Sequence, residues 1–336
     1  MPIITPEDAR EIARAALAAH GCDGLNAAAV ADTIARAERD GAASHGLFRL
    51  PGYIGSLKSG KVNGASRPRI EQRAPAILHV DGDGGYAPVA HQALAGPLAE
   101  AAKAQGVALA AITNTHHFSA LWAEVELLAE QGVAAIACVS FKPALPPAGG
   151  VKPLYGTNPL AFAWPRPGKQ AVVFDQASAV MARGEVMIAA RDGHRLPEGA
   201  GIGPDGNPTT DPNEVLKGAL LPFGGYKGAS LAMMIELLAG PLIGESLSVE
   251  AAETDKADGG PPRGGEFILA IDPGRARGDG GWAAHAERLF AEIVAQEGAR
   301  LPGEGRAARR ARIAAQGIEI AEDRLAELRA MAEAAA

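Results

Sequence analysis

The sequence predicts an α/β protein with more than one lobe. With 336 residues, the chain is long enough for a large hydrophobic core and for two or more lobes. Two continuous apolar runs, residues 107–112 and 133–139, have the length of buried β-strands. Segments with helical periodicity lie before and between these runs. This alternation of strands and helices is typical of an α/β core.

Helices are predicted at both ends of the chain. The segment from Thr5 to Asp8 is typical of a helix start, because threonine can cap the helix, proline suits its first turn and acidic residues favour the positive end of the helix dipole. This helix extends to about His20, and a second begins near Asn26. The last predicted helix, residues 321–331, places two leucines and a methionine on one face.

The middle of the chain alternates between apolar segments and segments rich in glycine and proline. The predicted elements are a strand at 77–80, a glycine-rich turn at 81–85, a helix at 88–105, the strand at 107–112, a loop at 113–118, a helix ending near 131, the strand at 133–139, an ordered loop at 142–168, a strand at 172–174, a polar excursion at 192–213, a helix or turn start at 211–214, a buried helix at 228–238 and a mobile loop at 253–265. No internal repeat interrupts this pattern.

The composition excludes several classes of protein. The formal net charge is −7 and the basic cluster at 306–312 is short, so no nucleic-acid partner is expected. The two cysteines, Cys22 and Cys138, provide neither a disulfide framework nor a thiolate zinc site. No apolar run reaches the roughly 20 residues that cross a bilayer, and the N-terminus lacks the features of a secretory signal. We therefore expect a cytoplasmic protein without a membrane partner.

A glycine-rich segment allows two interpretations. Residues 82–87 match the pattern G-x-G-x-x-G/A, follow a predicted strand and open a predicted helix, as a dinucleotide-binding turn does. However, the first loop carries aspartates, which would repel a pyrophosphate, and no acidic residue ends a second strand at the expected distance. A plain strand-to-helix turn is the favoured interpretation.

The segment Ser44-His45-Gly46, followed by Arg49, is a candidate catalytic site. If the segment is helical, His45 and Arg49 are four residues apart and share one face. An arginine fork binds carboxylates, and histidine is the common proton donor near neutral pH. The alternative is a capping serine, a surface histidine and a solvated arginine.

Three further segments carry polar groups at predicted loops or helix starts. The pair His116-His117 follows a buried strand and is expected to be exposed, but adjacent residues diverge and no partner has ligand spacing, so no metal site is predicted. The turn at 156–159 offers a hydroxyl and an amide. The glycine-rich turn at 224–228, with Lys227, can form a phosphate cradle at a helix N-terminus.

Taken together, these segments resemble the malate/L-lactate dehydrogenase type-2 family. The resemblance rests on five motifs in the family's order, SHG-x-x-RL at 44–50, HHF at 116–118, GTNP at 156–159, D-x-A at 175–177 and GYKG at 225–228, and covers residues 5–330. It implies a multi-lobed α/β fold with N- and C-terminal helices, a nicotinamide-binding domain that is not a Rossmann fold, and a homodimer that shares its active sites. The implied division is a helical part at 1–75, an α/β core at 76–115, the nicotinamide-binding domain at 116–250 and a C-terminal part at 251–336 that returns to the first domain.

Two details resemble one branch of the family, the Δ1-piperideine-2-carboxylate/Δ1-pyrroline-2-carboxylate reductases. The loop at 117–122 ends in Leu121-Trp122, where hydroxy-acid dehydrogenases more often carry a glycine and small or tyrosine residues. Glu185 is an acid where many relatives carry lysine. The branch typically has aspartate at this position, so the sequence departs from its pattern by one methylene group.

The resemblance also implies a role for individual residues. Ser44, His45 and Glu185 are the expected proton-delivering set, and Arg49 and Thr157 are expected to hold a substrate carboxylate. The residues expected to contact the cofactor are His117, Phe118, Ser119, Ala120, Leu121, Asp175, Gln176, Ala177, Arg183, Lys227, Arg300, Gly303, Gly305 and Arg306.

The implied activity is reduction of a cyclic imino acid to L-pipecolate or L-proline with NADPH, or with NADH. An acid beside a cationic C=N bond is favourable, whereas a lysine would repel it. The arginines at 300–310 can serve the 2′-phosphate of NADPH or can simply decorate a helix end. One alternative is an NAD-dependent 2-hydroxy-acid dehydrogenase acting on malate, lactate, ureidoglycolate or sulfolactate. Another is a catalytically inactive binding protein on the same fold.

Overall fold

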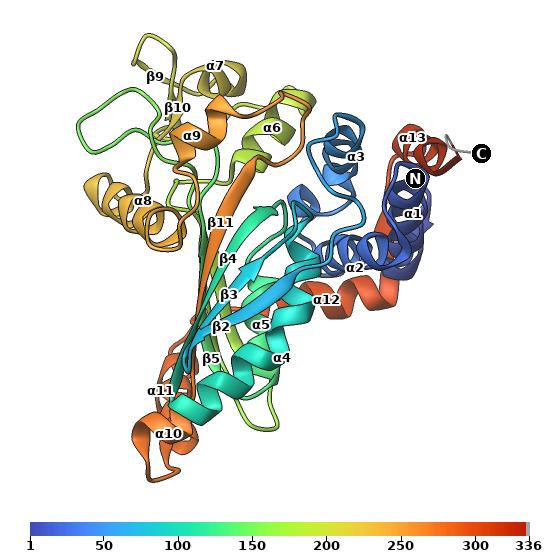
Figure 1. Ribbon diagram of the computed structural model, residues 1–336. Helices are drawn as coiled ribbons and strands as arrows, with labels where there is room; N and C mark the ends of the chain where they lie inside the picture. The colour runs from blue at the N-terminus through green and yellow to red at the C-terminus, as the bar shows by residue number, and fades with distance from the viewer. Residues whose placement is uncertain (334–336) are drawn as a thin grey trace.

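A seven-stranded sheet forms the centre of the computed structural model, which describes residues 1–333 (Figure 1). The last three residues of the expected C-terminal part, 334–336, lie outside the described residues. In spatial order the strands are β2 (Arg69–Ala74), β3 (Ile77–Asp81), β4 (Val107–His116), β11 (Arg263–Ile271), β5 (Ala134–Val139), β6 (Leu160–Trp164) and β7 (Val172–Gln176).

The central strand comes from the last third of the chain. β11 pairs antiparallel with both β4 and β5, so that Ile268 lies opposite Ala110 on one side and Ala137 on the other. Within this sheet, β3 and β4 are the parallel pair. The chain therefore has to complete its first 260 residues before the sheet can close.

Two helices cover one face of the sheet. α4 (Ala87–Gln105) and α5 (Trp122–Glu130) pack their leucines, among them Leu94, Leu98 and Leu128, against the small and branched side chains of the strands. These three leucines are almost fully buried, and burial of each contributes about 2 kcal/mol to the free energy of unfolding. On the other face, α8 (Tyr226–Ala239) packs against β5 and β11.

A helical layer at one end contains the N-terminus and α13 (Glu322–Glu333), the last described helix (Figure 1). It consists of α1 (Pro6–Ala19), α2 (Gly24–Arg39), α3 (Leu50–Lys58), α12 (Glu304–Gln316), α13 and the pair of β1 (Ile3–Ile4) with β12 (Ile318–Glu319). The predicted capping box is present, because Thr5 accepts from the Asp8 backbone and the Asp8 carboxylate accepts from the Thr5 backbone. The predicted C-terminal helix is also confirmed, since Leu325 and Leu328 are buried against α1.

The remaining elements form a lobe above the sheet and a projection below it (Figure 1). The lobe contains α6 (Arg183–Asp192), β8 (Gly201–Ile202), β9 (Pro208–Thr209), α7 (Pro212–Lys217), β10 (Ala219–Leu220) and α9 (Ser248–Glu253), around a small core of its own. The projection contains α10 (Pro273–Arg277) and α11 (Trp282–Val294).

Several sequence-based boundaries are wrong for a common reason. The segment 142–168 contains β6, the strand beginning at Val107 continues to His116, and residues 263–265 open β11 rather than belonging to a loop. The end of β4 and the start of β11 contain polar residues or glycine, and β6 is a short apolar segment between two prolines, so the local signal is weak in each case. Pairing with a neighbouring strand overrides that weak local preference.

The glycine-rich turn after β3 is a packing feature, as its favoured interpretation predicted. A Cβ atom at Gly82 would overlap the Thr115 side chain, and one at Gly85 would overlap the Ser66 hydroxyl. Asp83 adopts a φ of 56°. Gly82 is thus required for the close approach of this turn to the end of β4, and the positive φ of 67° at Gly84 also favours glycine.

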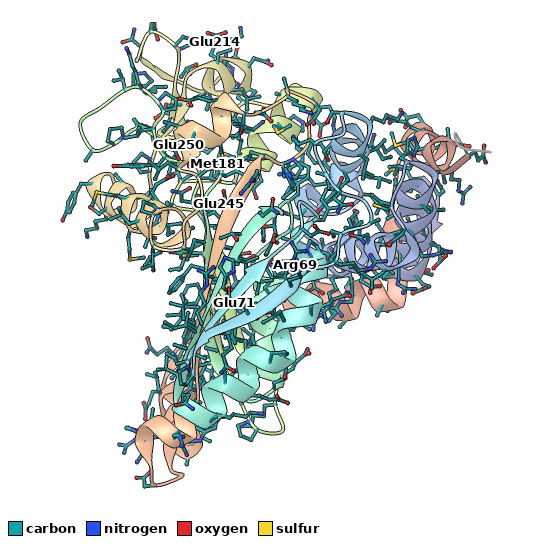
Figure 2. The ribbon with its side chains drawn as sticks, in the orientation of Figure 1. Arg69, Glu71, Met181, Glu214, Glu245 and Glu250 are labelled. Atoms are coloured by element: carbon teal, nitrogen blue, oxygen red, sulfur yellow. The ribbon has the colours of Figure 1, made fainter. Side chains whose placement is uncertain are left out.

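The outer edge of the sheet is charged. On β2, Arg69 pairs with Asp81 at 2.8 Å and Glu71 with Arg73 at 3.2 Å, and the side chains of Arg69 and Glu71 extend from this edge strand (Figure 2). Charged edge strands resist pairing with other sheets. Within residues 1–333, no helix is both long and apolar enough to cross a bilayer.

Candidate active site

The Ser44–Arg49 segment forms two consecutive 3-10 turns, η1 (Ala43–His45) and η2 (Leu47–Arg49). The segment is therefore not the single α-helix that would place His45 and Arg49 on one face by their spacing. Gly46 interrupts the helix, and the buried carboxylate of Glu38 accepts the Leu47 backbone N–H at 2.7 Å. The Arg49 side chain nevertheless lies beside the start of the segment, because its Nε donates to the Ser44 carbonyl at 2.7 Å.

His45 is held beside a hydroxyl and among positive groups. Its Nδ1 lies 3.1 Å from Ser44 Oγ. Burial lowers the pKa of His45 from 6.5 to about 3, with further contributions from the charges of Arg49 and His117. His45 is therefore neutral at pH 7 and acts as a hydrogen-bonding group.

Two guanidinium groups lie together without a carboxylate. The Arg49 guanidinium lies 4.4 Å from the centroid of the Phe118 ring. Burial lowers the pKa of Arg49 to about 10, and the charge of Arg183 adds to this effect while Tyr53 opposes it. Burial also lowers the pKa of Arg183. Neither arginine forms an ion pair within the described part of the chain, so the site presents unneutralised positive charge suited to an anion.

The start of α6 is fitted tightly against this segment. A Cβ atom at Gly184 would lie 2.9 Å from Arg49 Nη2 and 3.1 Å from Ser44 Cβ. The neighbouring Glu185 is exposed, and its carboxylate accepts the Ala182 backbone N–H at 3.3 Å, as part of the helix cap. The hydrogen bonds of residues 1–333 include none between Glu185 and Ser44 or His45.

Thr157 lies in a turn that a buried glutamate organises. Glu236, on α8, accepts from Asn158 Nδ2 at 2.8 Å and from the Ser248 backbone at 3.0 Å. The Gly156 backbone donates to Ser248 Oγ at 3.0 Å. Sequence reasoning missed Glu236. The available signal was a single acid within the apolar residues of that helix.

A second group of expected residues gathers where β7 ends. Asp175 accepts the Trp122 backbone N–H at 3.1 Å, at the first turn of α5. Burial raises the pKa of Asp175, although the hydrogen bond from Trp122 and the charges of Arg306 and His117 oppose this effect. The Arg306 guanidinium lies 5.1 Å from the centroid of a Trp122 ring. The end of β7, the first turns of α5 and α12, and the Arg306 guanidinium therefore lie close together.

This second group fits the anionic part of a dinucleotide. α12 begins after Gly303, which has a φ of 94° and provides no side-chain cap. The Glu304 N–H donates to the Leu301 carbonyl, so Gly305 and Arg306 offer the N–H groups of the first turn that an anion could bind. Arg306, in the first turn, has no carboxylate partner within the described residues. Gln176, Lys227 and Arg300 are exposed, whereas His117 to Ser119 and Leu121 are buried. Lys227 lies at the start of α8, where the Phe223 N–H donates to the Ser178 carbonyl just after β7.

The histidine pair does not project into solvent, contrary to expectation. His116 is buried at the end of β4, and burial lowers its pKa to about 4. His117 is buried beside Glu124, with Nε2 2.7 Å from Oε1. His91 lies 2.5 Å from Glu266 and 3.6 Å from Glu124.

These buried groups influence one another's ionisation. Burial raises the pKa of Glu124 well above its usual value, and the charge of Glu266 adds to the shift. Burial opposes ionisation of Glu266 as well, but the charge of His91, the hydrogen bonds with Glu124 and His91 and the charge of His117 together outweigh it and lower the pKa of Glu266. No sequence spacing could reveal this cluster, because its members come from positions 91 to 266.

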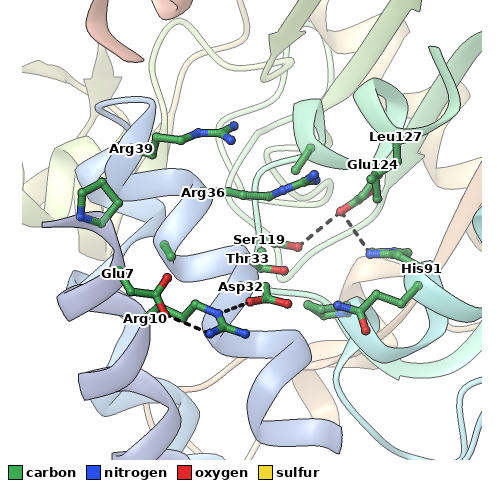
Figure 3. A pocket seen from close by; sticks show the side chains of 15 residues that line it. Glu7, Arg10, Asp32, Thr33, Arg36, Arg39, His91, Ser119, Glu124 and Leu127 are labelled. Carbon is green, nitrogen blue, oxygen red and sulfur yellow. Dashed lines mark hydrogen bonds and ion pairs between the residues drawn. The ribbon is translucent and has the colours of Figure 1, made fainter. Parts of the chain in front are cut away.

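A cavity of about 400 Å³ opens beside the cluster (Figure 3). Arg36 and Arg39 extend towards it from α2, while His91, Ser119 and Glu124 line the opposite side. Arg10 is committed to Asp32 and Glu7. The cavity lies between α1 and α2 on one side and α4 and α5 on the other, and Ser44 to Arg49 do not line it.

Fold and site together indicate an enzyme that acts on a small anionic molecule. The chain belongs to the malate/L-lactate dehydrogenase family, which it matches over residues 4–329.

Individual relatives are similar over nearly their whole lengths. The chain is 46% identical to a Δ1-pyrroline-2-carboxylate reductase of Ancylobacter novellus, over 95% of this chain and 94% of the relative. It is 40% identical to a (2R)-3-sulfolactate dehydrogenase (NADP+) of Chromohalobacter salexigens, over 98% of both chains. The crystal structure of Δ1-piperideine-2-carboxylate reductase from Pseudomonas syringae pvar. tomato superposes with a TM-score of 0.92 and 41% identity, covering 98% of this chain and 100% of that one. The resemblance inferred from five short motifs is thus confirmed.

The depressed pKa of His45 predicts a pH-dependent loss of stability. The folded pKa of about 3 lies below the unfolded value of 6.5, so the unfolded state binds more protons between these values. Stability therefore falls as pH decreases below about 6.5, by up to about 1.4 kcal/mol per pH unit for this group. In His45→Asn, we expect a shallower decrease of the urea-unfolding free energy between pH 7 and pH 5. His194→Gln, at an exposed histidine, is the control. Equal slopes for His45→Asn and the wild type would contradict the assignment.

Proposed function

We propose that this protein reduces a cyclic imino acid, Δ1-piperideine-2-carboxylate or Δ1-pyrroline-2-carboxylate, to L-pipecolate or L-proline. The observation that carries the proposal is the pair of unneutralised guanidinium groups of Arg49 and Arg183 beside the neutral His45. The guanidinium groups suit the substrate carboxylate, and the neutral His45 can accept a hydrogen bond from the ring N–H without adding positive charge beside it. The names of the similar reductases support the same substrate class.

Arg49 and Thr157 bind the substrate carboxylate. The Arg49 Nε is already committed to the Ser44 carbonyl, which fixes the guanidinium plane and leaves its Nη atoms for the ligand. The Phe118 ring packs against the guanidinium group and helps to hold it in place. A carboxylate anchored in this way presents one face of the C=N bond.

His45 keeps the proton on the ring nitrogen. In the tautomer that donates Nδ1–H to Ser44 Oγ, Nε2 accepts a hydrogen bond from the iminium N–H. Reduction of an iminium needs no proton transfer to nitrogen, so a neutral histidine is sufficient. Reduction of a 2-oxo acid requires a proton at the developing alkoxide, and a His45 pKa of about 3 disfavours that role. This difference favours the imino acid over the oxo acid.

NADPH is the proposed cofactor, with NADH as an alternative. The reduced nicotinamide supplies the hydride that adds to the C=N carbon, while the C=N π electrons become the nitrogen lone pair. Arg306, Arg300 and the first turn of α12 bind its phosphate groups. Arg310 is unavailable for this purpose because it is held by Asp40 at 2.7 Å and Glu126 at 3.1 Å. The segments 117–121 and 175–177, with Arg183 and Lys227, complete the proposed cofactor contacts.

The assembly is proposed to be a homodimer in the cytoplasm, with the four-part domain division implied by the family resemblance. The carboxylate of Glu185 is exposed, so it must move away from the helix cap to act as the proposed acid.

A 2-hydroxy-acid dehydrogenase is the second candidate function, favoured by the similarity to the sulfolactate dehydrogenase.

The direct test is a panel of substrates with the purified protein. We expect rapid NADPH oxidation with the two cyclic imines, and kcat/KM values at least roughly 100-fold lower with pyruvate, oxaloacetate and 3-sulfopyruvate, because the developing alkoxide of those substrates needs a proton and His45 is neutral at pH 7. Parallel assays with NADH measure the cofactor preference. Turnover confined to the oxo acids would contradict the proposal and establish the second candidate.

Substitutions at Glu185 test its charge separately from its cap. Glu185→Gln retains the capping geometry and Glu185→Lys reverses the charge. If the carboxylate favours the iminium, kcat/KM for the cyclic imines decreases in both variants and most strongly, by about 100-fold, in Glu185→Lys. Glu198→Lys, at an exposed position in the loop after α6, is the matched control. Full reductase activity in Glu185→Lys would exclude Glu185 from the mechanism.

A further inference from the structure

We propose that His91, His117, Glu124 and Glu266 form a binding site for a divalent transition-metal ion of the Zn²⁺ type. Each residue offers one ligand atom, and these atoms lie within 4.8 Å of one another. The four residues come from α4, the segment after β4, α5 and β11. A metal ion here would link parts of the chain that are far apart in sequence.

The ligand set suits zinc. Two imidazole nitrogens and two carboxylate oxygens are typical ligands, with metal–ligand distances of about 2.0–2.2 Å. A tetrahedral ion with such bonds separates its ligands by about 3.3 Å. His91 Nε2 lies 2.5 Å from a Glu266 oxygen, and His117 Nε2 lies 2.7 Å from a Glu124 oxygen, so these two ligand pairs are closer than that value, while all four ligand atoms lie within 4.8 Å of one another. Small side-chain movements would therefore be enough to complete the coordination.

The buried charges provide an independent argument. Glu124 is 5% exposed and Glu266 is fully buried. One oxygen of each, Oε2 of Glu124 and Oε1 of Glu266, has no hydrogen-bond partner. No lysine or arginine in the described part of the chain forms an ion pair with either carboxylate. A divalent cation would neutralise both carboxylates and provide their free oxygens with a partner.

An ion can reach the site. His91 and Glu124 line the cavity of about 400 Å³ shown in Figure 3, so the cluster borders a space large enough for hydrated ions. Ser119 Oγ donates to Glu124 Oε1 at 3.3 Å from the same side and can orient that carboxylate.

The proposed site is structural rather than catalytic. Four protein ligands close the coordination sphere, whereas catalytic zinc sites keep one position open. His117 begins the segment 117–121 that we assign to the cofactor. The metal would thus fix the start of this segment and tie it to the central strand.

The competing arrangement shares protons in place of a metal. A protonated His91 between the two carboxylates, with a proton on Glu124, would also be electrically neutral. The two arrangements make different predictions for added metal ions, because only the first gives stoichiometric binding at this position.

The test uses the full-length protein after chelator treatment and desalting. We expect one equivalent of Zn²⁺ per chain to bind, and saturating Zn²⁺ to raise the melting temperature by about 5 °C or more. Co²⁺ should give the intense visible absorption bands of a four-coordinate ion. Both responses should disappear in Glu266→Gln and His91→Leu. They should persist in His194→Gln, which removes an exposed histidine outside the cluster.

Several results would overturn the proposal. One is absence of a Zn²⁺ equivalent and of a Co²⁺ spectrum in the wild type, which would favour the proton-sharing arrangement. Another is unchanged binding in a folded Glu266→Gln variant. Because the Co²⁺ spectrum is measured on the wild type, the test holds even if the variants fail to fold.

Discussion

The close approach of α6 to the Ser44–Arg49 segment is the constraint on which the candidate active site depends. Gly184 lies so near Ser44 and Arg49 that a Cβ atom would be 2.9 Å from the Arg49 guanidinium. This contact joins the upper lobe to the N-terminal helical layer and brings Arg183 within electrostatic range of Arg49. Two positive groups with mutual repulsion are held together by packing, and an anionic ligand relieves the repulsion.

The central position of β11 has a similar consequence for the interior. Because β11 inserts between β4 and β5, it carries Glu266 beneath α4 and next to His91. The same insertion supports the end of β4, from which the segment with His117 continues. The geometry behind the proposed cofactor segment thus depends on a strand that arrives late in the chain.

Local features of the fold were predictable because local physics determines them. The cap at Thr5, the strand at Ile77 and the helix beginning at residue 87 follow from neighbouring residue types. By contrast, β11 begins with Arg263-Gly-Gly-Glu266, which lacks an apolar pattern, and its place in the sheet depends on partners more than 120 residues away. No single-sequence periodicity carries that information.

The sequence indicated which residues of the candidate site lie near one another better than it indicated how they are arranged. The motif around His45 singled out residues that lie together in the structure, namely Ser44, His45 and Arg49, with Phe118 beside the Arg49 guanidinium. The 3-10 turns and the capping position of Glu185 could not be predicted, because they depend on Glu38 and on the start of α6. Likewise, the buried cluster around Glu124 joins four elements, and adjacency in sequence gave only one of its members.

A crystal structure of the protein with NADP⁺ and L-proline or L-pipecolate tests the central claim most directly. We expect the product carboxylate to contact the Nη atoms of Arg49 and the ring nitrogen to lie within hydrogen-bond distance of His45. We expect the cofactor phosphates at the first turn of α12. A carboxylate bound elsewhere, with Arg49 and His45 free of ligand contacts, would contradict it.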